Sequence, residues 1–599
     1  MGAVRRGRRV QLGRPLVNAD RAAHRAPTNE WLPLIIVGFL AGVAWLAPTT
    51  ASALWSTTGW NAGRDLATLL SAYSHLFSPE QIAASGLAGP MFGYTTIAVG
   101  VAATTTVSLI TGRYRRRRRI TERGLAHGSD LDRFSRRSAI RTSEQILGER
   151  HRDPKRSALL VGREVYGGKP VWLPKESTVL VLAPPRSGKT SGTVAPAVVD
   201  HHGPVVATGV RRDIMLWTHP WRASTSAPLW LCEPMLPPDT QLPPGVQTVR
   251  WSPVAGCESL LTAKLRAEAL FAAVSEGGPN DQFWRSAGHT LLAAYLTSAA
   301  HRGGTIRDVL GWIDRDSDRS PADVLRWAAD QIVDPIERDA VASIADQIEA
   351  AVAQDPRFKA GVTGQVLQAL EPFRLPHIRR MCDVATDESF DPAKLLQSSG
   401  TIWMLGSESH QRQAAGVCTA LTAAIVEVAR ELGRETGRLR PPLLLALDEA
   451  VNVAPIPRLE QLLSTGGGSG IQTIVVLQSM AAARNAWGRE LGDALLDFNN
   501  AKIVLGGLSD AGDLEDLSTL LGVREERVLQ TSRSGRLGLL DAGDYSWSWR
   551  QVPVMRPDEI RKIDSEKRGH ALLIARSGRG ILLRQDRIFN RRPPKDCAA

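Results

Sequence analysis

The sequence contains a short loop whose residue types could hold a chain of phosphates. Residues 183–190 read APPRSGKT, which matches the pattern G-x-x-x-x-G-K-S/T except that Ala183 replaces the first glycine. Lys189 would reach the β- and γ-phosphates of ATP, and the Thr190 hydroxyl would ligate Mg²⁺. Gly188 leaves room for the phosphate, and Ala183 adds only a methyl group, which is tolerable at a negative φ. The residues predicted to contact the nucleotide are Ala183, Pro184, Pro185, Arg186, Ser187, Gly188, Lys189, Thr190 and Ser191.

A pair of acidic residues much further along the chain could supply the other half of this site. The apolar run Leu443–Leu447 predicts a buried strand, and Asp448 and Glu449 follow it directly. Asp448 would hold Mg²⁺ through water, and Glu449 would orient and deprotonate the attacking water. The alternative is that the two acids only cap the next helix. The phosphate loop upstream favours the hydrolytic interpretation.

A polar residue and several arginines could complete the chemistry. Gln478 follows the apolar run Thr473–Leu477, which predicts that it lies at the end of a neighbouring strand. A polar side chain at that place could sense the γ-phosphate. The alternative is that Gln478 is only a solvated strand end. Hydrolysis in ring ATPases commonly needs a positive charge from the neighbouring subunit. The sequence does not choose between the candidates, which are Arg211, Arg212, Arg458 and Arg484.

The elements that must position these residues follow an alternating pattern. Short apolar runs alternate with helical stretches, which predicts a parallel sheet covered on both faces and therefore an α/β fold. Helical signals dominate from Glu258 to Leu396, so this block is predicted to be an all-α insertion within one α/β domain. Thr531–Gln551 is polar and turn-rich, which predicts an exposed hairpin or loop. The remaining predicted strands lie at 179–182, 203–209, 227–234, 401–406 and 502–506.

The composition indicates a folded chain with an uneven charge. The 599 residues are 43% hydrophobic and 22% charged, which excludes a disordered protein. The five cysteines are scattered without a C-x-x-C pair, which argues against a disulfide scaffold and a zinc ribbon. Residues 1–125 contain 15 basic and 5 acidic residues, so most of the formal charge of +12 lies at the N-terminus. The basic charge is therefore no evidence for a surface that coats nucleic acid.

Two uncharged stretches near the N-terminus predict a transmembrane hairpin. Trp31–Ala47 and Met91–Thr111 are each long enough to span a bilayer. Arginines lie before the first and after the second, so both ends are expected in the cytoplasm with roughly 35–40 residues outside. The alternative for the first stretch is a cleaved signal peptide. The arginine run 113–119 is expected to set topology and contact anionic lipid, with DNA contact as the alternative.

Taken together, these features resemble the type IV secretion system coupling proteins, the membrane-anchored ATPases of conjugative DNA transfer. The resemblance extends from about residue 30 to residue 585 and is most specific between Leu443 and Ser479. The matching segments are Leu180–Thr190, Phe283–Leu296, Leu443–Ala450, Ser464–Ser479, Asn499–Gly507 and Arg556–Ile563.

The resemblance implies a hexameric ring of RecA-like P-loop NTPase domains with the all-α domain at the cytoplasmic mouth. It also implies ATP-driven passage of single-stranded DNA, with its attached relaxase, toward a secretion channel. Lys189, Glu449 and Gln478 would then be catalytic, and Thr190 and Asp448 would bind the metal. The implied partners are single-stranded DNA, relaxase, components of the type IV secretion channel, membrane lipid and further copies of the chain.

Two departures from the family pattern concern catalysis. GGGSG, at 466–470, replaces an arginine that some members carry before the Gln478 strand, so the trans-acting arginine is unassigned. An acidic residue expected after the second strand is also absent, because Thr208–Arg211 occupies that place. Residues 464–471 and 479–490 are candidate channel loops by position, and Gly466–Gly468 would let the backbone approach a DNA phosphate chain closely. The alternative is a flexible surface turn.

The predicted organisation places most of the chain in the cytoplasm, attached to the cytoplasmic (inner) membrane as a multi-pass protein. Two other functions remain as alternatives: a double-stranded DNA translocase of the chromosome-segregation type, and a non-hydrolysing membrane receptor for secreted protein substrates. The predicted segments are a basic N-terminus (1–30), a transmembrane hairpin with its extracytoplasmic loop (31–111), a basic linker (112–165), the N-terminal half of the nucleotide-binding domain (166–257), the all-α insertion (258–396), the C-terminal half of the nucleotide-binding domain (397–590) and a tail (591–599).

Overall fold

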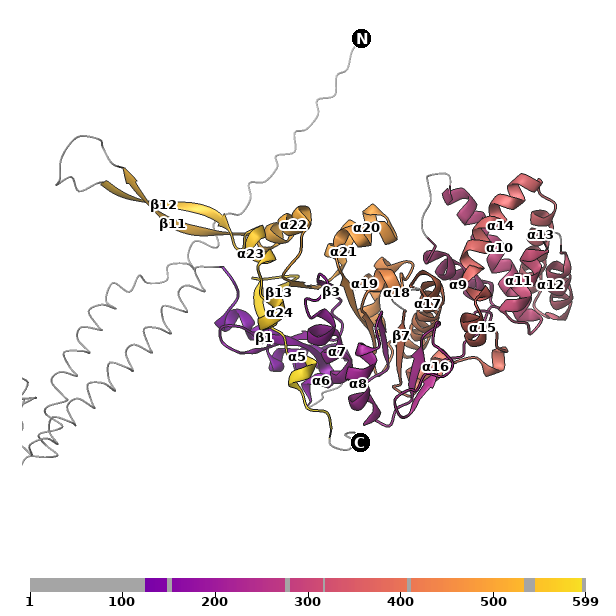
Figure 1. The fold of residues 1–599 in the computed structure, drawn as a ribbon, viewed down its shortest axis with the longest axis horizontal. Coiled ribbons are helices and arrows are strands. Elements are labelled where there is room, and N and C mark those ends of the chain that lie inside the picture. The colour runs from indigo at the N-terminus through magenta and orange to yellow at the C-terminus, as the bar shows by residue number, and fades with distance from the viewer. Residues whose placement is uncertain are drawn as a thin grey trace, which may run out of the picture. The chain divides into compact units, whose positions relative to one another are not determined.

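The computed structural model describes residues 124–147, 153–274, 281–315, 318–406, 411–532 and 544–594 (Figure 1). Within these ranges no helix is both long and apolar enough to cross a membrane. The long helix α17 (Gln411–Thr436), for example, carries charged residues throughout its C-terminal half. This finding contradicts the predicted multi-pass membrane location. The two predicted spans, Trp31–Ala47 and Met91–Thr111, lie outside the described residues.

A sheet of twelve strands forms the centre of the described chain, and eight of its strands are parallel. Seven of these eight are buried along their whole length, which explains why they appear in the sequence as continuous apolar runs. The prediction of an α/β fold with a large parallel sheet is confirmed. The parallel strands, in spatial order, are β10 (Ala501–Leu505), β3 (Val179–Leu182), β9 (Ile471–Leu477), β8 (Leu443–Leu447), β4 (Val205–Gly209), β7 (Thr401–Leu405), β5 (Leu229–Cys232) and β6 (Val246–Thr248).

One edge of the sheet is antiparallel, which the sequence did not indicate. Beyond β10 lie β13 (His570–Ala575), β14 (Ile581–Arg584), β1 (Ala158–Glu164) and β2 (Pro170–Pro174), each antiparallel to its neighbours. The predicted linker 112–165 therefore differs from the structure, since β1 lies inside it. Leu159 and Val161 of β1 are buried in the core, and this burial holds the segment in the sheet.

Alternate residues of each central strand pack into different cores on the two faces of the sheet. Val179 and Val181 contact the core that contains α7 (Ala195–Asp200), while Leu180 and Leu182 belong to the core on the opposite face. The other helices around the sheet are α5 (Arg136–Leu147), α6 (Pro154–Ser157), α8 (Asp213–Ala223), α18 (Ala450–Val453), α19 (Leu459–Ser469), α20 (Met480–Trp487), α21 (Arg489–Phe498), α22 (Ala511–Leu521), α23 (Pro557–Arg561) and α24 (Ser565–Arg568).

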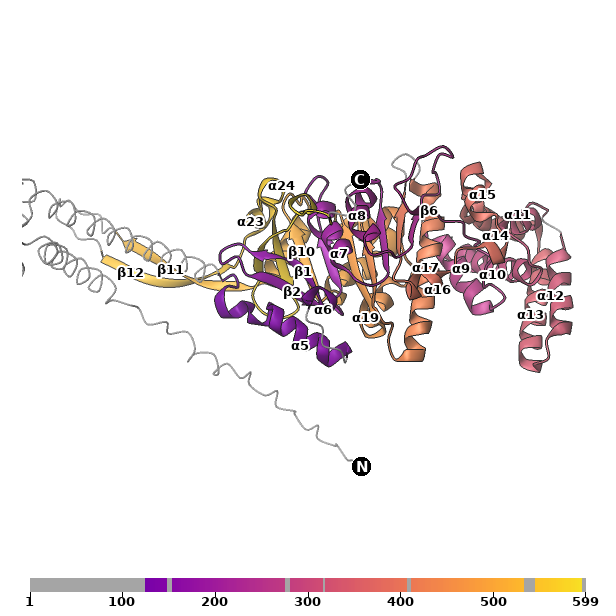
Figure 2. The same cartoon turned by 90° about the horizontal axis from the view of Figure 1, so that it is seen from below.

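Between β6 and β7 the chain forms a block of helices that lies beyond the β6 edge of the sheet (Figures 1 and 2). Local signals set several of the helix starts: Asp334, Asp355 and Asp391 each accept a backbone N–H bond and precede a proline. The helices are α9 (Leu260–Ala272), α10 (Asp281–His301), α11 (Ile306–Asp314), α12 (Ser320–Gln331), α13 (Pro335–Val352), α14 (Pro356–Leu370), α15 (Pro376–Cys382) and α16 (Pro392–Gln397). Short 3₁₀ helices lie at Gly128–Phe134, Glu371–Arg374, Thr386–Glu388 and Ile588–Asn590.

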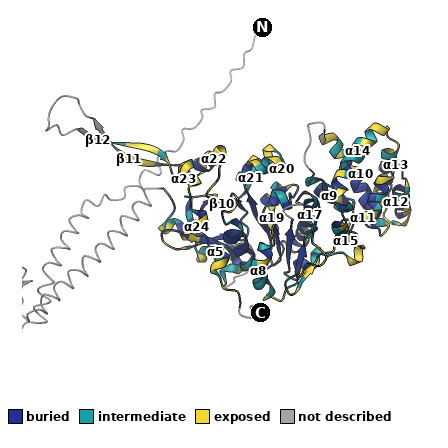
Figure 3. Cartoon of the chain, viewed as in Figure 1, coloured by how far each residue is buried: buried dark blue, intermediate teal, exposed yellow. Residues whose placement is uncertain are grey.

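A separate two-stranded ribbon, β11 (Val523–Ser532) and β12 (Asp544–Pro553), projects from the body. Trp547 and Trp549 on β12 are exposed, as Figure 3 shows for much of the ribbon. The predicted exposed hairpin or loop is therefore a hairpin, and it begins earlier than the predicted range.

Candidate functional site

The phosphate loop connects β3 to a short π-helical turn, Thr190–Val194, which continues into α7. The backbone N–H of Ala183 donates to the carbonyl of Leu477 at 2.9 Å, which ties the start of the loop to β9. Ala183 does not have a positive φ, so its methyl group is accommodated without backbone strain. Gly188 has φ +85°, a conformation that a side chain would strain. Arg186 also adopts a positive φ, of 63°.

The predicted site residues meet at one edge of the sheet because β3, β9, β8 and β4 are parallel neighbours whose carboxyl ends coincide. Lys189 Nζ lies 2.6 Å from Glu449 Oε1. The Thr190 hydroxyl donates to Asp448 Oδ2, and Gln478 Nε2 donates to Glu449 Oε2 at 2.9 Å. The structure thus brings together all five residues for which a catalytic or metal-binding role is predicted.

These side chains line a cavity of about 580 Å³. Its wall contains three acidic residues, Asp213, Asp448 and Glu449, and three basic ones, Arg186, Lys189 and Arg211. The acids and bases balance, so a strongly negative ligand such as a triphosphate would depend on Mg²⁺ and on these cations for its charge compensation.

The burial of Asp448 makes it a suitable metal ligand. The residue is 3% exposed, and burial raises the pKa of its carboxyl to about 6, against the opposing effects of Lys189 and of the Thr190 hydrogen bond. Its Oδ1 atom is buried and has no hydrogen-bond partner in the described part of the chain. A buried oxygen of this kind, beside a threonine hydroxyl, fits the oxygen ligands that Mg²⁺ prefers.

Glu449 has the opposite electrostatic character. Burial acts to raise the pKa of its carboxyl, but the Lys189 interaction and the hydrogen bonds from Asn452 and Gln478 outweigh it, so the pKa is lowered. The side chain is 18% exposed and can be reached from the cavity. A carboxylate that stays ionised beside the phosphate loop can orient a water molecule and accept its proton.

One of the four candidate arginines lines this cavity. Arg211 follows β4 and contributes to the cavity wall. The other three form ion pairs with nearby carboxylates. These pairs are Arg212–Glu233 at 2.9 Å, Arg458–Glu268 at 2.7 Å and Arg484–Asp493 at 2.6 Å.

The predicted channel loops at 464–471 and 479–490 are largely helical, as α19 and α20. Gly467 and Gly470 of the first segment lie too close to neighbouring backbone for a side chain. A Cβ at Gly467 would lie 2.6 Å from the carbonyl oxygen of Glu176, and Gly470 ends α19 with φ +83°. The prediction that these two segments are loops was therefore wrong.

The sequence analysis did not predict two residues of the site, Asn452 and Thr208. Asn452 Nδ2 donates to Glu449 Oε2 at 2.9 Å. The hydroxyl of Thr208, buried in β4, donates to the backbone carbonyl of Asp448 at 2.7 Å. Thr208 could have been found as a polar residue in an otherwise apolar strand. Asn452 could have been found from its position three residues after Glu449.

Comparison with known proteins adds a family assignment. The family model for type IV secretory system conjugative DNA transfer matches residues 129–599. Among solved structures, the bacterial conjugative coupling protein TrwB in an unbound form is 16% identical, covers 76% of this chain and 92% of its own, and has a TM-score of 0.49. TrwB in complex with ADP and Mg²⁺ is 16% identical over 77% of this chain and 94% of its own, with a TM-score of 0.48. VirB4 of Thermoanaerobacter pseudethanolicus is 15% identical over 72% and 96%, with a TM-score of 0.36. None of the curated proteins matches.

Proposed function

Because the chain belongs to the type IV secretory system conjugative DNA transfer family, we propose that it is an ATPase that moves single-stranded DNA, with its attached relaxase, into a type IV secretion channel. The observation that carries the ATPase proposal is the convergence of Lys189, Thr190, Asp448 and Glu449 on one cavity. In this proposal the α/β body is a RecA-like domain, and a hexameric ring of such domains is the working form.

The phosphate loop and the acidic residue Asp448 would bind ATP and its metal ion together. The backbone of residues 183–188 and the Lys189 ammonium would bind the phosphates, and Thr190 and Asp448 would hold Mg²⁺. Bound Mg²⁺ would supply a Lewis acid that neutralises phosphate charge. Lys189 is paired with Glu449 in this structure, so ATP binding would transfer this ammonium from the carboxylate to the phosphate chain.

Release of Lys189 would free Glu449 for hydrolysis. A water molecule would give a proton to the Glu449 carboxylate while its oxygen bonds to the γ-phosphorus. The bond from this phosphorus to the β–γ bridging oxygen would break, and that oxygen would leave with ADP. Gln478, which already contacts Glu449 at 2.9 Å, lies at the end of the adjacent strand, where it would report the presence of the γ-phosphate.

The proposal is tested with Lys189→Ala, and with Lys169→Ala as a control that removes an exposed lysine elsewhere. The purified full chain should release phosphate from ATP, with stimulation by single-stranded rather than duplex DNA. Lys189→Ala should abolish phosphate release and transfer of DNA from donor cells, and the control should retain both. Wild-type transfer with Lys189→Ala would refute the motor. Stimulation by duplex DNA alone would instead favour a double-stranded DNA translocase.

A further inference from the structure

The Glu449 carboxylate is held differently at its two oxygen atoms. Oε1 accepts a bond from Lys189 Nζ at 2.6 Å. Oε2 accepts from two side-chain amides, Gln478 Nε2 and Asn452 Nδ2, each at 2.9 Å. One oxygen is therefore paired with the ammonium group that would bind phosphate, while the other accepts hydrogen bonds from two neutral side-chain amides.

The backbone places Asn452 where it can make this contact. Glu449 has a left-handed conformation, with φ 56° and ψ 44°, at the start of α18. The backbone N–H groups of Asn452 and Val453 both donate to the Glu449 carbonyl, at 2.9 and 3.0 Å. This single turn sets the separation of residues 449 and 452 and returns the Asn452 side chain to the carboxylate. A positive φ at a non-glycine residue is energetically unfavourable and marks a position that the surrounding structure enforces.

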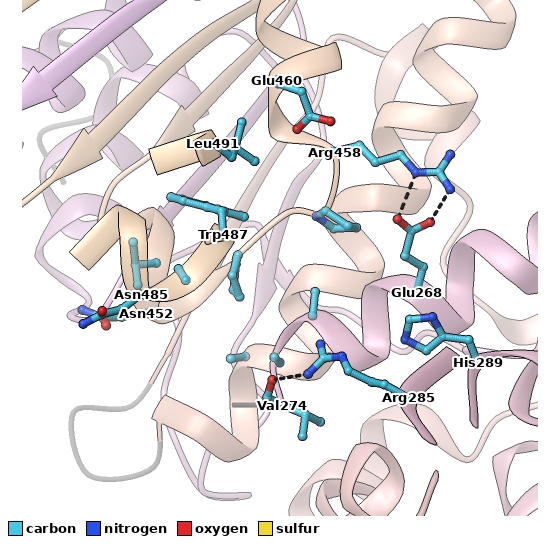
Figure 4. Close-up of a pocket in the computed structure, with 17 residues that line it drawn as sticks. Glu268, Val274, Arg285, His289, Asn452, Arg458, Glu460, Asn485, Trp487 and Leu491 are labelled. Atoms are coloured by element: carbon cyan, nitrogen blue, oxygen red, sulfur yellow. Dashed lines mark hydrogen bonds and ion pairs between the residues drawn. The ribbon is translucent and has the colours of Figure 1, made fainter. Parts of the chain in front are cut away.

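Asn452 also lines a second cavity, of about 730 Å³, between the helical block and the nucleotide-binding region of the chain. Figure 4 shows this cavity, with the Arg458–Glu268 pair in its wall and Asn485 and Trp487 among its other lining residues. Asn452 is only partly buried, so packing alone does not fix its side chain. The bond to Glu449 therefore defines where its amide points, and a substitution at 452 would meet open space rather than a packed core.

From these contacts we infer that Asn452 is a positioning residue for Glu449, an inference that rests on the hydrolytic role proposed above for this carboxylate. Asn452 and Gln478 hold Oε2, and Lys189 leaves Oε1 when a phosphate chain binds. Oε1 is then the oxygen that accepts the proton from water, with its direction set by the two amides on the other oxygen. Without Asn452, Oε2 keeps one donor, and the carboxylate can rotate about its terminal bond.

The experiment compares Asn452→Ala with Asn452→Gln and with the matched control Asn485→Ala. Asn485 lines the same cavity, but no hydrogen bond within the described ranges joins it to Glu449. In the full chain, Asn452→Ala should lower kcat at least about tenfold, as expected for a misdirected general base, with KM for ATP within about twofold of wild type. Asn452→Gln keeps an amide donor and has cavity space for its extra methylene, so it should recover most of kcat. Asn485→Ala should behave as wild type.

A second measurement separates this inference from the ATPase proposal. High-resolution structures of the nucleotide-free wild type and Asn452→Ala should show the Glu449 side chain in one orientation in the former and displaced from Gln478 in the latter. An unchanged Glu449 orientation would overturn the inference, as would an unchanged kcat or an equal loss in Asn485→Ala. If the wild-type chain released no phosphate, the ATPase proposal would fail, and the orientation of Glu449 would still decide the role of Asn452.

Discussion

The substitution Glu449→Gln should have opposite effects on nucleotide binding and on hydrolysis, because it should strengthen ATP binding and abolish turnover. The Glu449 carboxylate holds Lys189 at 2.6 Å, so it would compete with the phosphates for this ammonium. Glutamine has nearly the same shape but no charge. We therefore expect the variant to bind ATP more tightly than the wild type while losing turnover.

The burial of the pair sets the size of the effect. The two side chains are 10% and 18% exposed, so their attraction is stronger than that of a surface ion pair. A hydrogen bond between charged groups contributes about 1.5–3 kcal/mol, and a neutral amide oxygen would retain some of it. A net relief of about 1.4 kcal/mol corresponds to about tenfold tighter ATP binding. Loss of the general base should lower kcat by about 10²–10⁴-fold.

The assay combines a direct ATP titration of the full chain with a measurement of phosphate release. Glu460→Gln is the matched control, because it removes a carboxylate that lines the second cavity and not the nucleotide cavity. It should change neither quantity. If Glu449→Gln bound ATP no more tightly than the wild type, the Lys189–Glu449 pair would not oppose binding. If it kept its turnover, Glu449 would not be the base.

Three further predictions concern charge and burial. With the pKa of Asp448 at about 6, lowering the pH from about 7 to about 5 protonates its carboxyl, and this proton must leave before Mg²⁺ binds. The Mg²⁺-dependent component of ATP affinity should therefore fall about tenfold. ATP titrations with and without Mg²⁺ at both pH values measure this component, and an equal effect of Mg²⁺ on ATP affinity at the two pH values would contradict the prediction. Arg211→Ala removes a cation from the cavity wall and should raise KM for ATP about fivefold to tenfold in steady-state assays, whereas an unchanged KM would exclude a phosphate contact. Arg222 is 2% exposed and donates to three backbone carbonyls, so Arg222→Met should lower the free energy of unfolding by about 3 kcal/mol in urea denaturation, and a loss below about 1 kcal/mol would show that water replaces these bonds.

The central strands and the convergence of the site could be predicted from the sequence, because both depend on strong local signals. A strand buried on both faces, such as Leu443–Leu447, must be apolar throughout, and it was recognised with its correct bounds. Neighbouring parallel strands end at the same edge of the sheet, so acids after one strand and a phosphate loop after another were expected to meet.

Other features depended on contacts between distant segments. The segment that forms β1 contains Gly162 and Arg163 among its apolar residues, and its place in the sheet is set by pairing with β2 and β14. Gly466–Gly468 suggested a loop, but the helix there needs a small residue where Gly467 meets the Glu176 backbone. The Asn452 contact follows from the left-handed backbone at Glu449, for which the sequence carries no signal.

The strand order has a consequence for biosynthesis. β1 leaves the ribosome early, yet within the sheet its link to the central strands runs through β14 and β13, which are among the last strands to be made. The β1–β2 pair must therefore wait, unattached on that side, until β13 and β14 have been made. A nascent chain stalled shortly before residue 570 would hold the phosphate loop and both site carboxylates, while its first two strands would still lack their place in the sheet.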